Sequence, residues 1–172
     1  MMEHSSRADE WIALAMDKYL SMVYRLAYAR TCSRQDAEDV TQEVMLKLVS
    51  HAHEITGEEH LKAWLLRVTA NQSISLFRTA WRRLTLPLND AVLEARLPEP
   101  PHDALDEALQ SLNPDLRTVI HLYYYEDMST AEIADTLHIR PEAVRKRLSR
   151  ARKLLQDRLS GEGRMTDVSE RI

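Results

Sequence analysis

Residues 128–155, with the sequence MSTAEIADTLHIRPEAVRKRLSRARKLL, decide the fold of this 172-residue chain. Ser129 and Glu132 are spaced as in a capping box, which predicts a short helix that opens at Ser129. Residues 138–140 follow as a turn, and Pro141 suits the first position of a longer helix because no N–H is needed there. A capped short helix, a turn and a longer helix in this order predict a helix-turn-helix.

The longer predicted helix has one apolar side and one basic side. Its apolar residues recur at helical spacing: Val144, Leu148, Ala151 and Leu155. Because a helix fits the major groove of DNA and its first turns reach the base edges, a basic polar side favours DNA binding. The candidate contacts are Arg145, Lys146, Ser149 and Arg150. Paired amphipathic helices also occur in proteins that never bind DNA, and this purely structural alternative stays open.

The rest of the chain shows helical periodicity in two groups. Apolar residues three and four apart predict helices over about 11–30, 34–50 and 61–83, and then over 105–112 and from Pro114 onward. Residues 51–60 are predicted as a loop, and Gly161 and Gly163 are predicted to end the last helix. Strand-like alternation is absent from the sequence.

A linker is predicted between the two groups. Four of the six prolines lie between residues 84 and 104, where no long apolar stripe occurs. The predicted fold class is therefore all-α, with two small helical domains at 8–83 and 105–159, a proline-containing linker at 84–104 and a tail at 160–172. The second domain contains the helix-turn-helix.

The segment from residue 61 to residue 83 is basic and aromatic together. It contains no acidic residue and five basic ones, namely Lys62, Arg67, Arg78, Arg82 and Arg83. Aromatic faces stack on unpaired bases while cations bind phosphates, a combination that favours a single strand over a closed duplex. Trp64 and Phe77 fit the apolar stripe and are interpreted as core, whereas Trp81 is the better candidate for stacking.

An acidic face is predicted on the preceding helix. Asp39, Gln42 and Glu43 fall on one side of it and can receive arginines from a partner. The alternative is an ordinary solvated face, or an acidic cluster that interacts favourably with the helix dipole.

Composition argues against several classes of function. The apolar runs are shorter than the ~20 residues of a membrane span, and residues 1–10 do not resemble a signal peptide, so we expect a cytoplasmic protein without membrane insertion. Cys32 is the only cysteine, and three glycines leave no phosphate-binding loop. His51, His53 and His60 lack the spacing of a metal site. No catalytic constellation can be identified, so we expect neither an enzyme nor a cofactor.

Two segments resemble conserved regions of the bacterial extracytoplasmic-function (ECF) sigma factors. Residues 24–83, with DVTQE at 39–43 and AWLLRVTAN at 63–71, resemble region two. Residues 105–159, with LNPDLR at 112–117, AEIA at 131–134 and VRKRLSRAR at 144–152, resemble region four. Both regions and their order match, over about four-fifths of the chain.

The resemblance implies a sigma factor, not itself an enzyme, that binds core RNA polymerase and directs it to promoter DNA. It implies that Asp39, Gln42 and Glu43 dock on the coiled coil of the largest polymerase subunit. It implies that residues 51–60 and Asn71 capture a flipped base of the minus-ten element. Further contacts to the melted strand would come from Arg67, Arg78, Trp81, Arg82 and Arg83. The minus-thirty-five element would be read by Ser129, Arg145, Lys146, Ser149 and Arg150. The family also implies an anti-sigma factor as a partner.

The chain departs from the usual family pattern at five positions. Ser75 stands where aspartate is usual, and Met45 where phenylalanine is usual. Near the turn, His138, Arg140 and Ala143 stand where glycine, a small polar N-cap and threonine are usual.

Two other functions stay open. One is a stand-alone helix-turn-helix repressor or activator, which should dimerise and bind a palindromic duplex without polymerase. The other is a helical adaptor that uses the acidic face and residues 123–125, three consecutive tyrosines, for protein contacts alone.

Overall fold

A computed structural model describes residues 2–78 and 103–169, with the side chains of residues 10–73 and 103–161. The chain divides between Pro98 and Glu99 into two compact units. The described residues form helices and no strand, so the prediction of an all-α fold with two helical groups is confirmed. None of the described helices combines the length and the hydrophobicity that crossing a bilayer requires.

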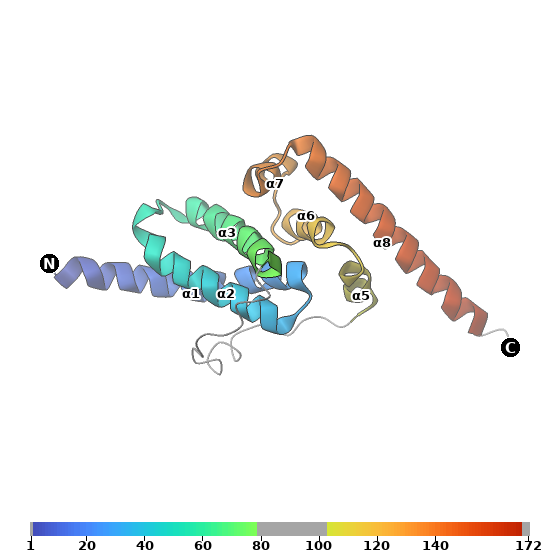
Figure 1. The fold of residues 1–172 in the computed structure, drawn as a ribbon, viewed down its shortest axis with the longest axis horizontal. Helices are drawn as coiled ribbons and strands as arrows, with labels where there is room; N and C mark the ends of the chain where they lie inside the picture. Colours follow the sequence, from blue (N-terminus) through green and yellow to red (C-terminus); the bar gives the residue numbers. More distant parts are fainter. Residues whose placement is uncertain (1, 79–102, 170–172) are drawn as a thin grey trace. The chain divides into compact units, whose positions relative to one another are not determined.

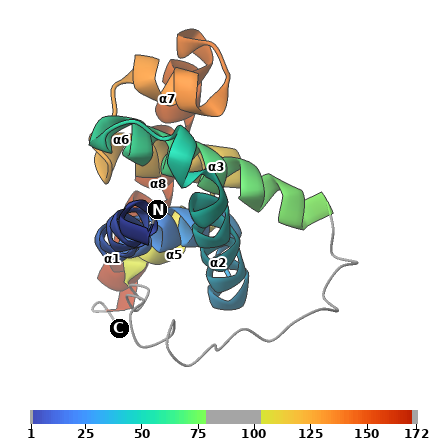
Figure 2. The ribbon, with the colours of Figure 1, turned by 90° about the vertical axis from the view of Figure 1, so that its left-hand side faces the viewer.

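The described part of unit 1 contains three α-helices packed on one another: α1 (Met2–Thr31), α2 (Arg34–His51) and α3 (Glu58–Arg78) (Figure 1 and Figure 2). A short 3-10 helix, η1 (Ala52–Glu54), follows α2. Apolar side chains three or four residues apart on each helix are buried, and their burial is the main stabilising contribution to the unit. The fully buried ones include Val23, Leu26, Val40, Leu48 and Leu65.

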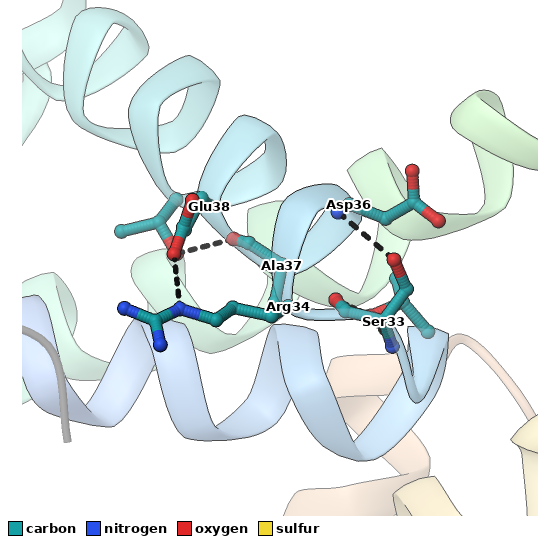
Figure 3. Close-up of polar contacts among 7 residues, drawn as sticks. Ser33, Arg34, Asp36, Ala37 and Glu38 are labelled. Atoms are coloured by element: carbon teal, nitrogen blue, oxygen red, sulfur yellow. Dashed lines mark hydrogen bonds and ion pairs between the residues drawn. The ribbon is translucent and has the colours of Figure 1, made fainter. Parts of the chain in front are cut away.

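The start of α2 is fixed by local chemistry. The Asp36 N–H donates to Oγ of Ser33 at 3.2 Å, so Ser33 is the N-cap of the helix. Nε of Arg34 donates to Oε1 of Glu38 at 2.9 Å, one turn along the same helix (Figure 3). Cys32 has φ 49°, and this left-handed residue lets the chain turn from α1 into α2.

Unit 2 contains α5 (Ala104–Gln110), α6 (Pro114–Tyr124), α7 (Thr130–Leu137) and α8 (Pro141–Ser169). The other three helices all pack against α8. Arg117 is buried, and its Nη1 donates to the Gln110 carbonyl at 3.1 Å and to the Leu112 carbonyl. This guanidinium satisfies carbonyls that the end of α5 leaves without helical partners.

The structure corrects three predicted boundaries. α1 begins at Met2 rather than near Trp11, because residues without an apolar stripe still form helix where glycine and proline are absent. Only residues 55–57 of the predicted 51–60 loop are non-helical, since the end of α2, η1 and the start of α3 take the rest. α8 continues through Gly161 to Ser169, into the predicted tail, because a helical glycine costs only about 1 kcal/mol and need not end the helix.

Residues 79–102 lie outside the described part of the chain. The linker at 84–104 and the exact domain limits therefore stay predictions.

Candidate nucleic-acid and protein interfaces

α7 and α8 form the predicted helix-turn-helix. The Ser129 N–H donates to Oε2 of Glu132 at 2.8 Å and the Glu132 N–H donates to Oγ of Ser129 at 3.3 Å, so the capping box is confirmed. α7 ends at His138, which has left-handed angles of φ 54° and ψ 44°. The Ile139 N–H then donates to the Ala134 carbonyl at 3.0 Å, which closes the turn before α8 begins at Pro141.

The polar side of α8 presents the predicted duplex contacts together. Val144 and Leu148 are buried on the inner side of the helix. The exposed side carries Arg145, Lys146, Ser149 and Arg150. Nη2 of Arg145 donates to Oε1 of Glu142 at 3.0 Å, so this guanidinium already has a carboxylate partner one turn earlier. Three cations and a hydroxyl in the first turns of one helix are suited to phosphates and base edges.

Two other arginines hold α8 in place. Nη2 of Arg147 lies 3.1 Å from Oδ2 of Asp115 at the start of α6. Nε of Arg152 donates to Oη of Tyr124 at 2.8 Å, and its guanidinium carbon lies 5.3 Å from the ring centre of Tyr123. In the sequence, these arginines all belong to one basic segment, residues 140–158. In the structure, two of them, Arg147 and Arg152, contact α6 instead of lying free on the polar side of α8.

One side of α3 gathers candidate contacts to a single strand. Positions 60, 64, 67 and 71 follow at steps of four, three and four, and they therefore share a face of the helix. Asn71 is exposed and Arg67 is half-buried. Trp64 is also half-buried, with its ring centre 5.9 Å from that of His51, so its assignment to the core was wrong. The spacing from Trp64 to Asn71 would have placed Trp64 on this face.

Other predicted single-strand contacts cannot be placed. The side chain of Arg78 lies outside the described residues, as do Trp81, Arg82 and Arg83 entirely. The side chain of Phe77, which was predicted to lie in the core, is also outside them.

The connection from α2 to α3 is short and well tied. Ile55 is buried and anchors it to the core, while Gly57 adopts φ 81°, which only glycine takes without strain. The Thr56 N–H donates to Nδ1 of His60 at 3.2 Å. We name residues 52–57 the α2–α3 connection. His53 and Thr56 are exposed on it.

The exposed face of α2 is both acidic and apolar. Asp39 and Glu43 are exposed and Gln42 is half-buried, so the structure presents the three predicted residues together. Leu46 and Val49, farther along the helix, are also about half exposed, at 50% and 52%. Sequence reasoning missed both, although they lie off the buried stripe that contains Val44 and Leu48. Exposed aliphatic groups next to carboxylates are typical of a protein interface.

The three histidines considered as metal ligands make other contacts. His51 packs on Trp64, and Nε2 of His53 lies 3.5 Å from Oε1 of Glu54. Nδ1 of His60 accepts from Thr56, as noted above. Within the described residues, no group of three or more His, Cys, Asp or Glu side chains is arranged to hold a metal ion.

Comparison with known proteins finds both predicted regions. Residues 15–83 match the family Sigma-70 region 2, and residues 102–155 match Sigma-70, region 4. The ECF RNA polymerase sigma factor SigL of Mycobacterium tuberculosis is 33% identical over 149 residues, which cover 81% of this chain and 84% of the relative. SigV of Bacillus subtilis is 29% identical over 143 residues, covering 81% and 85%. SigE of Mycolicibacterium smegmatis is 33% identical over 153 residues, covering 83% of this chain but only 59% of that longer protein.

Two solved structures have a similar fold. The sigma factor RpoE of Bartonella quintana, in complex with the anti-sigma factor NepR, aligns with a TM-score of 0.67 and 21% identity over 88% of this chain and 96% of that one. CnrH, in complex with the cytosolic domain of CnrY, aligns with a TM-score of 0.63 and 20% identity over 91% and 94%. With the two Sigma-70 regions in order and SigL matched over most of its length, the chain belongs to the ECF family of RNA polymerase sigma factors.

Proposed function

We propose that this protein is an alternative sigma factor that binds core RNA polymerase and directs it to a restricted set of promoters. The observation that carries the proposal is the presence of both Sigma-70 regions in one chain, each with an exposed face of the matching chemistry. The proposed role is regulatory rather than enzymatic, and its proposed place of action is the cytoplasm, where the polymerase works.

The proposed contact with core polymerase is the exposed face of α2. Asp39, Gln42 and Glu43 offer two carboxylates and an amide to basic residues of the coiled coil in the largest subunit. Leu46 and Val49 extend this face, and burying them would add hydrophobic stabilisation to the charged contacts.

The proposed minus-ten site combines the α2–α3 connection with α3. Asn71 and the connection would hold an extruded base, since a base must leave the stack before its edges can be read. Arg67 and, beyond the described side chains, Arg78, Trp81, Arg82 and Arg83 would bind the melted strand through phosphate contacts and stacking.

The proposed minus-thirty-five site is the exposed side of the helix-turn-helix. Arg145 and Arg150 can pair with guanine edges, whereas Lys146, Ser149 and Ser129 are suited to phosphates.

An anti-sigma factor is the further proposed partner. One solved structure of similar fold is a sigma factor in complex with an anti-sigma factor, and the other, CnrH, is in complex with the cytosolic domain of a second protein, CnrY.

The test is promoter-directed transcription with core polymerase from the source organism on a library of genomic fragments. We expect discrete start sites with wild type, and loss of them with Asp39→Arg/Glu43→Arg and with Arg145→Ala/Arg150→Ala. Glu10→Arg/Asp157→Arg and Lys153→Ala/Arg158→Ala change exposed charges equally at other positions and should retain activity. A protein that gives no start sites but binds a palindromic duplex as a dimer would instead be a stand-alone regulator.

A further inference from the structure

Two side chains of α1 converge on one carboxylate at the first residue of α3. Oη of Tyr19 donates to Oε1 of Glu58 at 2.9 Å, and Nζ of Lys18 donates to the same oxygen. Glu58 directly follows Gly57, so this contact fixes the place where the α2–α3 connection ends and α3 begins. The residues that meet are 39 and 40 positions apart in sequence.

The two donors differ in how firmly they are held. The Tyr19 residue is 7% exposed, so its ring is fixed among core side chains and its hydroxyl has one direction. The Lys18 side chain is 58% exposed and that of Glu58 is 65% exposed, and an ion pair of this kind is weak and screened by salt. Tyr19 is therefore the donor that gives the contact its geometry, while Lys18 favours the charged form of the carboxylate.

The pKa values of Glu58 and Tyr19 agree with this arrangement. The hydrogen bond from Lys18, followed by that from Tyr19, lowers the pKa of Glu58. Burial, followed by the hydrogen bond to Glu58, raises the pKa of Tyr19. At neutral pH the carboxylate is thus a charged acceptor and the phenol keeps the proton that it donates.

The contact bears on the geometry of the proposed minus-ten site. The connection is fixed at its first end by the end of α2, where the His51 ring packs on Trp64, and in its middle by buried Ile55. At its last end, the Thr56 N–H donates to His60 within the same segment, whereas the contact of Glu58 with Tyr19 and Lys18 ties this end to α1. Because Asn71 lies on the same helix as Glu58, the direction in which α3 leaves the connection sets the position of Asn71 relative to it.

We infer that Tyr19 is a positioning residue for minus-ten recognition, which acts through Glu58 to set the α2–α3 connection against Asn71. This inference rests on the proposed function, because it assigns Tyr19 a part in the base selectivity of that same site. Tyr19 and Glu58 need not touch the DNA. Their contribution lies in keeping the two halves of the base-binding site in register before the base arrives, which lowers the cost of ordering them on binding.

The experiment compares holoenzymes on one promoter found with wild type, in which each minus-ten position is changed in turn to the other three bases. We expect Tyr19→Phe and Glu58→Ala to lower discrimination at the captured base about three- to tenfold, the range expected for loss of one hydrogen bond. The double variant should lose no more than either single variant, since both act through one contact. Glu58→Gln retains an acceptor for Tyr19 and should restore most of the discrimination.

Glu38→Ala is the matched control, since it breaks an ion pair with Arg34 in the same unit but away from the connection (Figure 3). Affinity for core polymerase and discrimination at the minus-thirty-five element should stay at wild-type values in every variant. These two readouts would fall together in a variant that was merely destabilised.

Three outcomes overturn the inference. It fails alone if wild type starts transcription at discrete sites while Tyr19→Phe and Glu58→Ala both discriminate within twofold of wild type. It also fails alone if both variants lose discrimination equally at all promoter positions, which would indicate a general change in the holoenzyme rather than an effect on the captured base. If wild type gives no start sites with core polymerase, the proposed function fails and the inference fails with it. Should Tyr19→Phe not fold, Glu58→Ala decides, because Glu58 is exposed.

Discussion

Nε2 of His121 lies 3.4 Å from Oε1 of Glu126, and both side chains are buried where α6 passes into the turn before α7. The His121 ring also stacks on that of Tyr125, with ring centres 5.2 Å apart. A polar pair in the interior of a unit this small ties the end of α6 to the segment that leads into the helix-turn-helix.

Replacing one member of this pair should account for most of the destabilisation that replacing both produces. His121→Leu removes the imidazole that lies beside the buried Glu126 carboxyl and should lower the free energy of unfolding by about 2–4 kcal/mol. In His121→Leu/Glu126→Leu the second substitution should cost much less, and urea denaturation of the four proteins of the cycle measures the difference. His53→Leu removes the exposed pair with Glu54 and should change stability by less than about 0.5 kcal/mol. Strictly additive costs would show that His121 and Glu126 do not interact.

Two left-handed residues flank α7 and should be improved by glycine. Asp127 and His138 have φ 53° and 54°, and side chains with a Cβ are strained in this region. Asp127→Gly and His138→Gly should each raise the free energy of unfolding by about 0.5–1 kcal/mol. Ser111, with φ −72°, is in the right-handed region, so Ser111→Gly should destabilise instead. Thermal denaturation of the three variants compares the signs, and a drop for both of the first two contradicts the expectation.

Ser129 has two roles, as the N-cap of α7 and as a proposed DNA contact, and a negatively charged substitute distinguishes them. Ser129→Ala removes the acceptor for the Glu132 N–H and should cost about 1 kcal/mol of stability. Ser129→Asp keeps an acceptor at the N-cap and should retain most of that stability, but it places a negative charge where a phosphate is proposed to bind. We therefore expect Ser129→Asp to fold normally and to bind the minus-thirty-five duplex more weakly than Ser129→Ala. Equal binding of the two variants would place Ser129 away from the DNA.

The contact between α1 and Glu58 should make stability depend on pH in acid. Because its pKa is lower in the folded protein than its ordinary value of 4.5, Glu58 stabilises the fold above that value and loses this effect as pH falls through the folded-state pKa. The melting temperature of wild type should therefore exceed that of Glu58→Gln at pH 7, and the gap should close below pH 4.5 and shrink in high salt. Glu59→Gln, in the same turn, is the charge-matched control. A difference in melting temperature that widens towards acid pH would contradict a lowered pKa of Glu58 in the folded protein.

Features that depend on a few adjacent residues could be predicted from the sequence. Ser129 and Glu132 define the start of α7 because both halves of a capping box lie within one helical turn. Pro141 defines the start of α8 for a similarly local reason. The acidic face of α2 was predictable because helical periodicity alone decides that Asp39 and Glu43 point away from the buried stripe.

Features that depend on contacts between distant residues could not be predicted in this way. The approach of Tyr19 to Glu58 joins two helices, and no local pattern indicates which acid of α3 it reaches. Trp64 was misassigned because its spacing fits both the apolar stripe of α3 and the face that carries Asn71, and the contact with His51 shows that its ring lies at the edge of the core. Gly161 was predicted to end the last helix, but α8 continues through it. The low helix propensity of one glycine is small compared with the combined preference of the residues around it.

The bracing of α8 has a consequence for how promoter preference can change. Arg147 and Arg152 attach the helix to α6 through Asp115 and Tyr124, on residues separate from those proposed to read DNA. Substitutions at the reading positions therefore leave the attachments of the helix intact. Under the proposed function, the residues that read the promoter can therefore change while the scaffold that presents them stays the same.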